Sequence, residues 1–145
     1  MRTVNCSALV PHSASEMFAL VGDIESYPLF LPWCRHAIVH HRAESIVEAS
    51  LNVHRGVINK TFTTRNTLYP DTAIELELVG GPFRHLEGGW QFRQLSDIGS
   101  KVTLELEFDF AHRITDAAFG SVFEDICNSL VDAFTQRAAS LHGDF

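Results

Sequence analysis

The sequence has few of the features that would place it in several large classes of protein. Its three cysteines, Cys6, Cys34 and Cys127, lie at unrelated spacings, which suits neither a disulfide framework nor a zinc site. It has no apolar run near the ~20 residues that a membrane span needs, no signal-peptide pattern in its first ten residues, and no repeat or low-complexity tract. We therefore expect a single cytoplasmic domain over residues 1–145.

Positive charge is also scarce, because 11 Lys and Arg stand against 18 Asp and Glu, for a formal net charge of −7. Broad attraction to nucleic acid requires a basic face, so we expect no DNA partner. The sequence contains no glycine-rich phosphate loop, HExxH motif or nucleophile elbow. Of its eight histidines only His40 and His41 are adjacent, and neighbours on a strand point to opposite faces, so we expect no metal site and no catalytic residue.

What the sequence does contain is a long region of alternating apolar and polar residues, from residue 33 to about residue 110. Residues 102–110 are the clearest case, with Val, Leu and Phe on one face and Thr, Glu and Asp on the other. Residues 47–54 and 74–78 repeat this period of two, and Gly, Pro and Asp turn signals separate the runs. With one more strand over residues 3–10, the pattern predicts an antiparallel sheet of about seven strands.

Helices are expected on either side of these strands. Ser13 and Glu16 have the spacing of a capping box, which predicts a short helix over residues 14–21, with a second turn at 23–26. Residues 114–142 carry apolar side chains every three or four positions, which predicts a helix of about 42 Å. That order is typical of an α+β helix-grip (START-like) fold, in which a curved antiparallel sheet wraps around a long C-terminal helix and two short helices follow the first strand.

Five segments carry a family resemblance that covers nearly the whole chain. They are Asp23–Cys34 (DIESYPLFLPWC), Phe62–Arg65 (FTTR), Gly81–Leu86 (GPFRHL), Gly89–Phe92 (GWQF) and Val131–Ala138 (VDAFTQRA). In this order they resemble the coenzyme-Q-binding START-domain family, including its RatA-type bacterial members. The resemblance implies non-catalytic binding of ubiquinone or a related isoprenoid lipid, in support of respiration or quinone synthesis. Enclosure of such a ligand is the function that we expect, and the alternative that the resemblance implies is a toxin that binds the large ribosomal subunit and blocks subunit joining.

A lipid site has a physical basis in this fold, since a bent sheet and a straight helix can leave an unfilled apolar gap whose contacts a ligand supplies. The alternative is a closed core. The side chains that we expect at such a site are Tyr27, Phe30, Leu31, Trp33, Lys60, Phe62, Leu76, Phe83, Leu104, Phe108, Phe119, Val122, Phe123 and Ile126. Lys60 and Asn66 are candidate hydrogen-bond donors if Phe62 faces inward, and a one-residue slip of that strand would reverse the assignment. The loop that ends at Phe83 is a candidate lid.

Several other expectations concern charged residues. Arg65 and Arg137 are expected to pair with sheet carboxylates such as Glu105 or Glu107. The ribosome-binding interpretation predicts a basic outer patch, made by Arg35, Arg42, Arg55, Arg84 and Arg93. A third interpretation is a polyketide cyclase or aromatase-like enzyme that uses His36, Asp109 or Lys60, none of which has an identifiable partner. No integral membrane span is expected, and transient contact with a membrane surface stays open.

Overall fold

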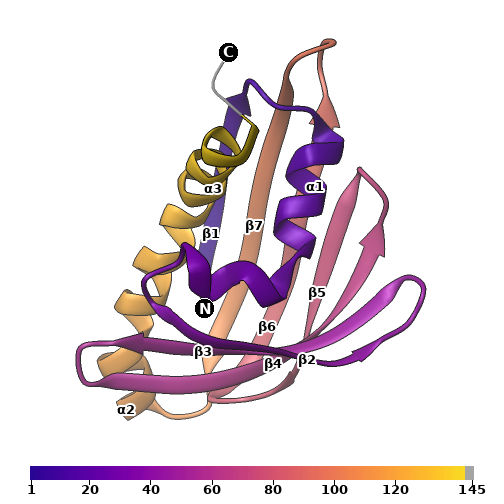
Figure 1. Cartoon of the computed structure of the whole chain (residues 1–145). Helices are drawn as coiled ribbons and strands as arrows, with labels where there is room; N and C mark the ends of the chain where they lie inside the picture. Colours follow the sequence, from indigo (N-terminus) through magenta and orange to yellow (C-terminus); the bar gives the residue numbers. More distant parts are fainter. Residues whose placement is uncertain (143–145) are drawn as a thin grey trace.

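The computed structural model describes residues 1–142, in which one seven-stranded antiparallel sheet has the order β1-β7-β6-β5-β4-β3-β2 (Figure 1). The strands are β1 (Arg2–Val10), β2 (Cys34–Arg42), β3 (Ile46–Arg55), β4 (Ile58–Tyr69), β5 (Ala73–Gly80), β6 (Phe83–Gln94) and β7 (Ser100–Phe110). Strands β2 to β7 follow one another as a meander, whereas β1 pairs with β7, so that Arg2 lies opposite Phe108 and Val10 opposite Ser100. The predicted helix-grip fold is confirmed.

The alternation in sequence becomes the two faces of this sheet. On β7, Val102, Leu104 and Phe108 are 0% exposed, while Glu105 and Glu107 between them face the outside. The inward face packs against the helices and forms the core, because burying these apolar side chains removes their surface from water.

Strand β4 was the one whose orientation the sequence left open. Phe62 is buried and lies opposite Leu51 of β3, and Thr64 and Asn66 are buried on the same face. Period two therefore places these two polar side chains inside the molecule, on the face that carries Phe62.

Two short helices follow β1. Helix α1 (Ala14–Gly22) begins at Ser13, whose hydroxyl accepts a hydrogen bond from the Glu16 backbone N–H at 3.1 Å. The 3₁₀ helix η1 (Ile24–Leu29) contains Pro28, and it is joined to α1 because the buried Tyr27 hydroxyl donates to the Val21 carbonyl. This 3₁₀ helix packs beside β2, and its buried residues Ile24 and Tyr27 belong to the core.

The C-terminal rod is a helix with a widened turn near its start. It consists of α2 (Arg113–Thr115), the π-helical turn η2 (Asp116–Gly120) and α3 (Ser121–His142), where the sequence predicts one uninterrupted helix. Arg2 of β1 holds the widened turn, because its Nε donates to Asp116 Oδ1 at 2.9 Å and its Nη1 to Glu124 Oε1 at 3.1 Å.

The apolar stripe of the rod is shorter than predicted. Phe123, Ile126 and Phe134 are buried, but Ala138 is the last buried residue of the helix and Leu141 is 50% exposed. The rod lies along β1, and α1 packs over β5–β7 (Figure 1). Among the described residues, no helix combines the length and the apolar character that crossing a membrane requires.

Candidate functional site

A small cavity of about 80 Å³ lies between the inner face of the sheet and α3. Its walls come from η1, the segment before β2, strands β3–β7 and the middle of α3. The lining residues are Ile24, Tyr27, Trp33, Ala49, Leu51, Phe62, Thr64, Asn66, Leu76, Leu86, Trp90, Leu104, Leu106, Phe123, Ile126, Cys127, Leu130 and Phe134. None of them is His, Asp, Glu, Lys or Arg, so the cavity is an apolar enclosure.

One polar spot interrupts this apolar lining. Thr64 and Asn66 are 8% and 6% exposed, and the Thr64 hydroxyl donates to Asn66 Oδ1 at 2.8 Å. Because Asn66 Oδ1 accepts this bond, the amide nitrogen is the donor that the pair presents, and it donates to no other described residue. A hydrogen-bond donor in the wall of an apolar space suits a ligand that carries one oxygen acceptor on an apolar body.

The size of the cavity limits what the closed form can hold. Sites for drug-sized ligands usually have volumes of about 300–1,000 Å³, well above the 80 Å³ found here. Three lining side chains, Trp33, Leu51 and Leu130, are only half-buried and lie between the β2–β3 side of the sheet and α3. A large ligand could enter only if side chains such as these moved outward.

The structure brings together seven of the side chains predicted to contact a ligand. Tyr27, Trp33, Phe62, Leu76, Leu104, Phe123 and Ile126 line the cavity. Leu31, Phe83, Phe108 and Phe119 are buried elsewhere in the core, and Phe30 and Val122 are half-buried outside the lining. Sequence reasoning missed Leu51 and Leu106, although both lie on the apolar face of an alternating strand, and it missed Trp90 in the GWQF segment. Ligand contact by any of these residues stays a prediction.

Phe83 is a core residue, and its interpretation as part of a lid is not supported. Its ring centroid lies 4.9 Å from that of Phe110 and 5.0 Å from that of Phe123. Phe108 lies 5.0 Å from Phe123, and Phe62 lies 5.7 Å from the same ring. We call Phe62, Phe83, Phe108, Phe110, Phe119 and Phe123 the aromatic cluster, and it fills the space between the sheet and the start of α3.

Lys60 was placed wrongly. It shares the inward-facing side of β4 with Phe62, but it lies near the first residue of the strand, past the aromatic cluster, and is exposed. A charged side chain is therefore in water rather than in the apolar enclosure, where an unpaired ammonium would be costly.

Of the two predicted arginine ion pairs, the structure contains one. Arg65 pairs with a sheet carboxylate, as expected, and the partner is Glu48 on the neighbouring strand at 3.5 Å. Arg137 forms no ion pair with a described residue, and its guanidinium carbon lies 5.1 Å from the centre of the Phe30 ring. Arg137 thus makes a cation–π contact in place of an ion pair, and its buried Nε has no hydrogen-bond partner among the described residues.

Groups near the cavity that can titrate stay protonated at neutral pH. Burial raises the pKa of the Tyr27 phenol and that of the Cys127 thiol, and it raises the pKa of Cys34 to about 11. The candidate acid–base residues lie elsewhere: His36 is exposed on β2, and Asp109 accepts a hydrogen bond from Arg84, which lowers the pKa of that carboxyl. The cavity can therefore enclose an apolar ligand, but it offers no acid–base pair for catalysis.

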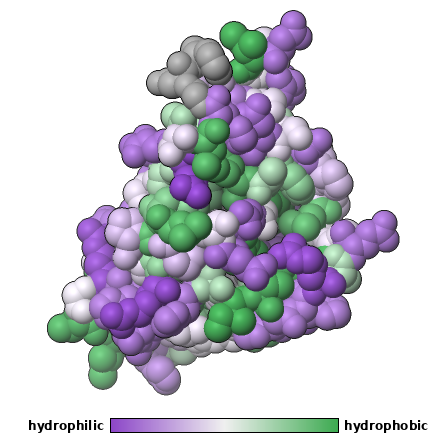
Figure 2. Space-filling model, viewed as in Figure 1, coloured by the Kyte–Doolittle hydropathy of each residue, from purple (hydrophilic) through white to green (hydrophobic). Residues whose placement is uncertain are grey.

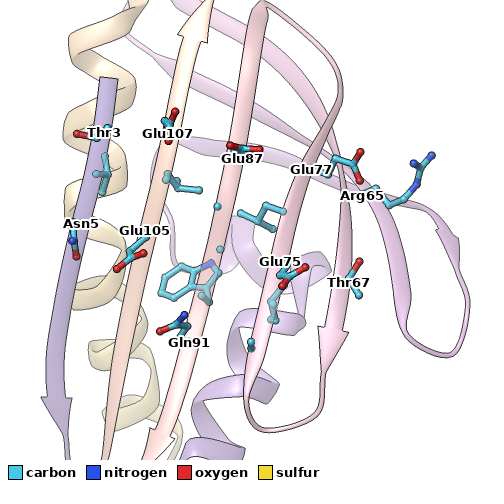
Figure 3. Close-up of a pocket in the computed structure, with 18 residues that line it drawn as sticks. Thr3, Asn5, Arg65, Thr67, Glu75, Glu77, Glu87, Gln91, Glu105 and Glu107 are labelled. Carbon is cyan, nitrogen blue, oxygen red and sulfur yellow. The ribbon is translucent and has the colours of Figure 1, made fainter. Parts of the chain in front are cut away.

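The opposite face of the sheet carries a second, open hollow of about 780 Å³ (Figure 3). Five glutamates from β5, β6 and β7 line it: Glu75, Glu77, Glu87, Glu105 and Glu107. Arg65 is the one cation among its lining residues. This acidic outer face repels phosphate groups, so a nucleic-acid partner would have to approach another side of the molecule.

An antiparallel sheet that grips a C-terminal helix around an apolar enclosure defines a START-like, helix-grip domain. The chain belongs to the family described as polyketide cyclase / dehydrase and lipid transport, whose model matches residues 10–135.

Its curated relatives include proteins named ribosome association toxin RatA. The chain is 45% identical over 137 residues to the Pseudomonas aeruginosa protein, covering 94% of this chain and 95% of the relative. It is 44% identical over 144 residues to the Vibrio cholerae protein, covering 99% and 100%. The mitochondrial coenzyme Q-binding protein COQ10 of Drosophila melanogaster is 28% identical over 139 residues, covering 93% of this chain and 57% of that protein.

Solved structures agree on the fold. A START superfamily protein from Mycobacterium smegmatis has a TM-score of 0.80 at 20% identity, covering 96% of this chain and 98% of that chain. The ZhuI aromatase/cyclase from a Streptomyces species has a TM-score of 0.83 at 18% identity, covering 94% and 93%. At such identities the likeness extends to the fold alone.

Proposed function

We propose that the chain is a ribosome-association protein of the toxin type, which acts in the cytoplasm by binding the large ribosomal subunit and hindering subunit joining. The observation that carries this proposal is the 44–45% identity, over almost the whole of each chain, to proteins named ribosome association toxin. The enclosed cavity without an acid–base pair agrees with a role in binding rather than in catalysis.

The charges of the molecule restrict how such binding could occur. The predicted patch of five arginines does not form, because Arg35 and Arg42 lie on β2, whereas Arg84 and Arg93 lie on β6, and three strands separate β2 from β6 in the sheet. Arg42 pairs with Glu25 at 3.6 Å, and Arg84 pairs with Asp109. Ribosomal RNA would therefore meet other cations, away from the acidic outer face.

Sucrose gradients test the proposal. We expect purified protein, added to ribosomes at low magnesium concentration and then returned to conditions of joining, to increase the fraction of free subunits and to co-migrate with the large one. The Glu75→Lys/Glu105→Lys variant, which reverses charge on the acidic outer face, serves as a control and should act at least as well. Unchanged subunit profiles with no co-migration would contradict the proposal.

A second candidate function is the enclosure of a quinone or another apolar ligand with a carbonyl oxygen. Asn66, a buried residue that lines the cavity and whose amide nitrogen donates to no described residue, favours it, as does the similarity to a coenzyme Q-binding protein. The 80 Å³ volume weighs against a preformed quinone site, so binding would have to open the cavity.

Intrinsic fluorescence tests this second function, because the two tryptophans of the chain, Trp33 and Trp90, both line the cavity. We expect a short-chain ubiquinone to quench their emission in a saturable way. Asn66→Leu, which removes the amide donor, should weaken binding about tenfold, as for a lost hydrogen bond to a buried group. Quenching that does not saturate, together with no lipid in organic extracts of the purified protein, would exclude this function.

A further inference from the structure

One end of the molecule combines protruding aliphatic side chains with cations. The β3–β4 turn, the β5–β6 turn and the segment from β7 into α2 meet there, and we call residues 55–60, 79–84 and 109–116 the loop end. The second and third segments are in contact, because the Ala111 N–H donates to the Pro82 carbonyl at 3.1 Å. The second segment also approaches β4, where an added Cβ on Gly81 would be 2.7 Å from that of Phe62. The β3–β4 turn leads into that strand and lies on the same side of the molecule as α2 (Figure 1).

Two aliphatic side chains protrude from the loop end into water. Val57, at the tip of the β3–β4 turn, is 102% exposed, and Ile114, in α2, is 83% exposed. Hydrophobic atoms project at the lower left of the molecule in Figure 2, where Figure 1 places the β3–β4 turn and α2. Neither side chain packs against the core, so both are free to enter another apolar phase.

The charge of the loop end has the opposite sign to that of the chain. Arg55, Lys60 and Arg113 are exposed, and none of them forms an ion pair with a described residue. The two carboxylates within these segments are already neutralised, since Asp109 pairs with Arg84 and Asp116 with Arg2. A chain with a net charge of −7 thus presents one end with three unpaired cations.

We propose that the loop end docks on an anionic lipid bilayer. Cations within a Debye length of such a surface are attracted to its headgroups, while aliphatic tips insert at the boundary with the acyl chains. RNA would use the cations but would gain little from Val57 and Ile114, because single strands stack on aromatic side chains. The phenylalanines of these segments, Phe83 and Phe110, are buried, and His112 is the exposed ring.

Docking at this end would bring the bilayer to the aromatic cluster that closes the cavity. Phe62 and Phe123 belong to that cluster and also line the cavity, and their ring centroids are 5.7 Å apart. The lipid-facing surface and the apolar enclosure are therefore separated by only these rings, which suits the exchange of an apolar ligand with a membrane.

The opposite end of the sheet supplies matched controls. Leu9 and Ile98 are 73% and 72% exposed there, close to the exposure of the two loop-end tips. Arg93 and Lys101 lie opposite each other on β6 and β7, but the exposed Asp97 sits in the turn that joins those strands. The same kinds of substitution can thus be made at both ends of the molecule.

Co-sedimentation of the full chain with vesicles tests the proposal. We expect binding to vesicles of equal parts phosphatidylcholine and phosphatidylserine, none to phosphatidylcholine alone, and weaker binding as salt is added. Val57→Ser/Ile114→Ser should weaken binding at least tenfold, whereas Leu9→Ser/Ile98→Ser should leave it unchanged. Each of Arg55→Gln, Lys60→Gln and Arg113→Gln should weaken it about fivefold, and Arg93→Gln/Lys101→Gln less than twofold.

Two results would overturn the proposal. One is wild-type protein that stays in solution with the anionic vesicles, and the other is binding that loop-end and control variants reduce equally. If the wild type does not bind vesicles, but Arg55→Gln, Lys60→Gln and Arg113→Gln abolish co-migration with ribosomes, the loop end is an RNA-binding surface instead. If the protein binds ribosomes but not vesicles, only the membrane-docking proposal fails and the proposed function stands. The failure of one proposal can therefore be distinguished from the failure of the other.

Discussion

The two halves of the helix–sheet interface are built from similar apolar residues, yet one is solid and the other is not. Near the start of α3 the six rings of the aromatic cluster interlock, with centroids as close as 4.9 Å. One to three turns further along, Ile126, Leu130 and Phe134 line a cavity of about 80 Å³, although Phe134 itself packs against the Trp90 ring at 5.3 Å. The comparison teaches that two sections of α3 have different roles. Its start contributes most to the stability of the fold, and its middle leaves the space that a ligand could occupy.

The largest expected loss of stability comes from a substitution in the aromatic cluster, the solid half of the interface. Phe83→Ala should lower the free energy of unfolding by about 3–5 kcal/mol, because it leaves a hole among rings that cannot collapse. Leu76→Ala, beside the existing cavity, should cost about 2 kcal/mol, near the low end for such truncations. Urea unfolding followed by circular dichroism measures both, and equal losses would show that the two halves do not differ in packing.

The buried thiols of the cavity half predict a weaker, pH-dependent effect. Burial raises the pKa of Cys127 and Cys34 above the usual 9.0, so the folded state keeps protons that the unfolded chain releases. Their contribution to stability is complete below pH 9 and is lost as the pH rises above it, by about 1 kcal/mol per thiol at pH 10. Unfolding free energies between pH 8 and 10 should fall for the wild type and fall less for Cys127→Ala. Parallel slopes would contradict the assignment.

A smaller effect separates stability from ligand binding within the cavity half. Thr64→Val/Asn66→Leu replaces both partners of the buried 2.8 Å hydrogen bond with apolar groups. Such paired replacements are nearly neutral, so we expect a change in unfolding free energy of less than about 1 kcal/mol, together with quinone binding that is about tenfold weaker. The single variant Asn66→Ala, which leaves Thr64 without its acceptor, should be less stable than the double variant. A double variant that binds ubiquinone as tightly as the wild type does would show that Asn66 is not the donor.

The smallest effect concerns the far end of α3, where Arg137 lies over Phe30. Arg137→Gln should lower the unfolding free energy by about 0.5 kcal/mol, since the cation–π contact lies at a half-exposed site. Phe30→Leu combined with Arg137→Gln forms a double-mutant cycle, which isolates the contact from the packing of each side chain. A coupling energy of zero would mean that the stacking contributes nothing.

The sequence was most informative where a regular period decides the structure. Alternation located the strands, and the buried face of β7 is the one that Val102, Leu104 and Phe108 predict. It was least informative where position along an element matters: Lys60 and Phe62 share one face of β4, yet only Phe62 lies under the helix.

The π-helical turn and the cavity could not be predicted for a different reason. The widened turn at residues 116–120 is held by Arg2, more than 100 positions earlier in the chain. The volume of the cavity is the small difference between the space that the sheet and helix enclose and the volume of the side chains that fill it, and no local sequence pattern predicts that difference. Asn66 was recognisable as a candidate donor only once Phe62 was known to face inward.

The pairing of β1 with β7 has a consequence for how the chain is made. Strand β1 is synthesised about 90 residues before its partner β7, and α3, which covers it, follows later still. Contacts so distant in sequence slow folding, because a long loop must close before they form. The nascent chain therefore carries β1 without its partner until residues 100–110 have been made.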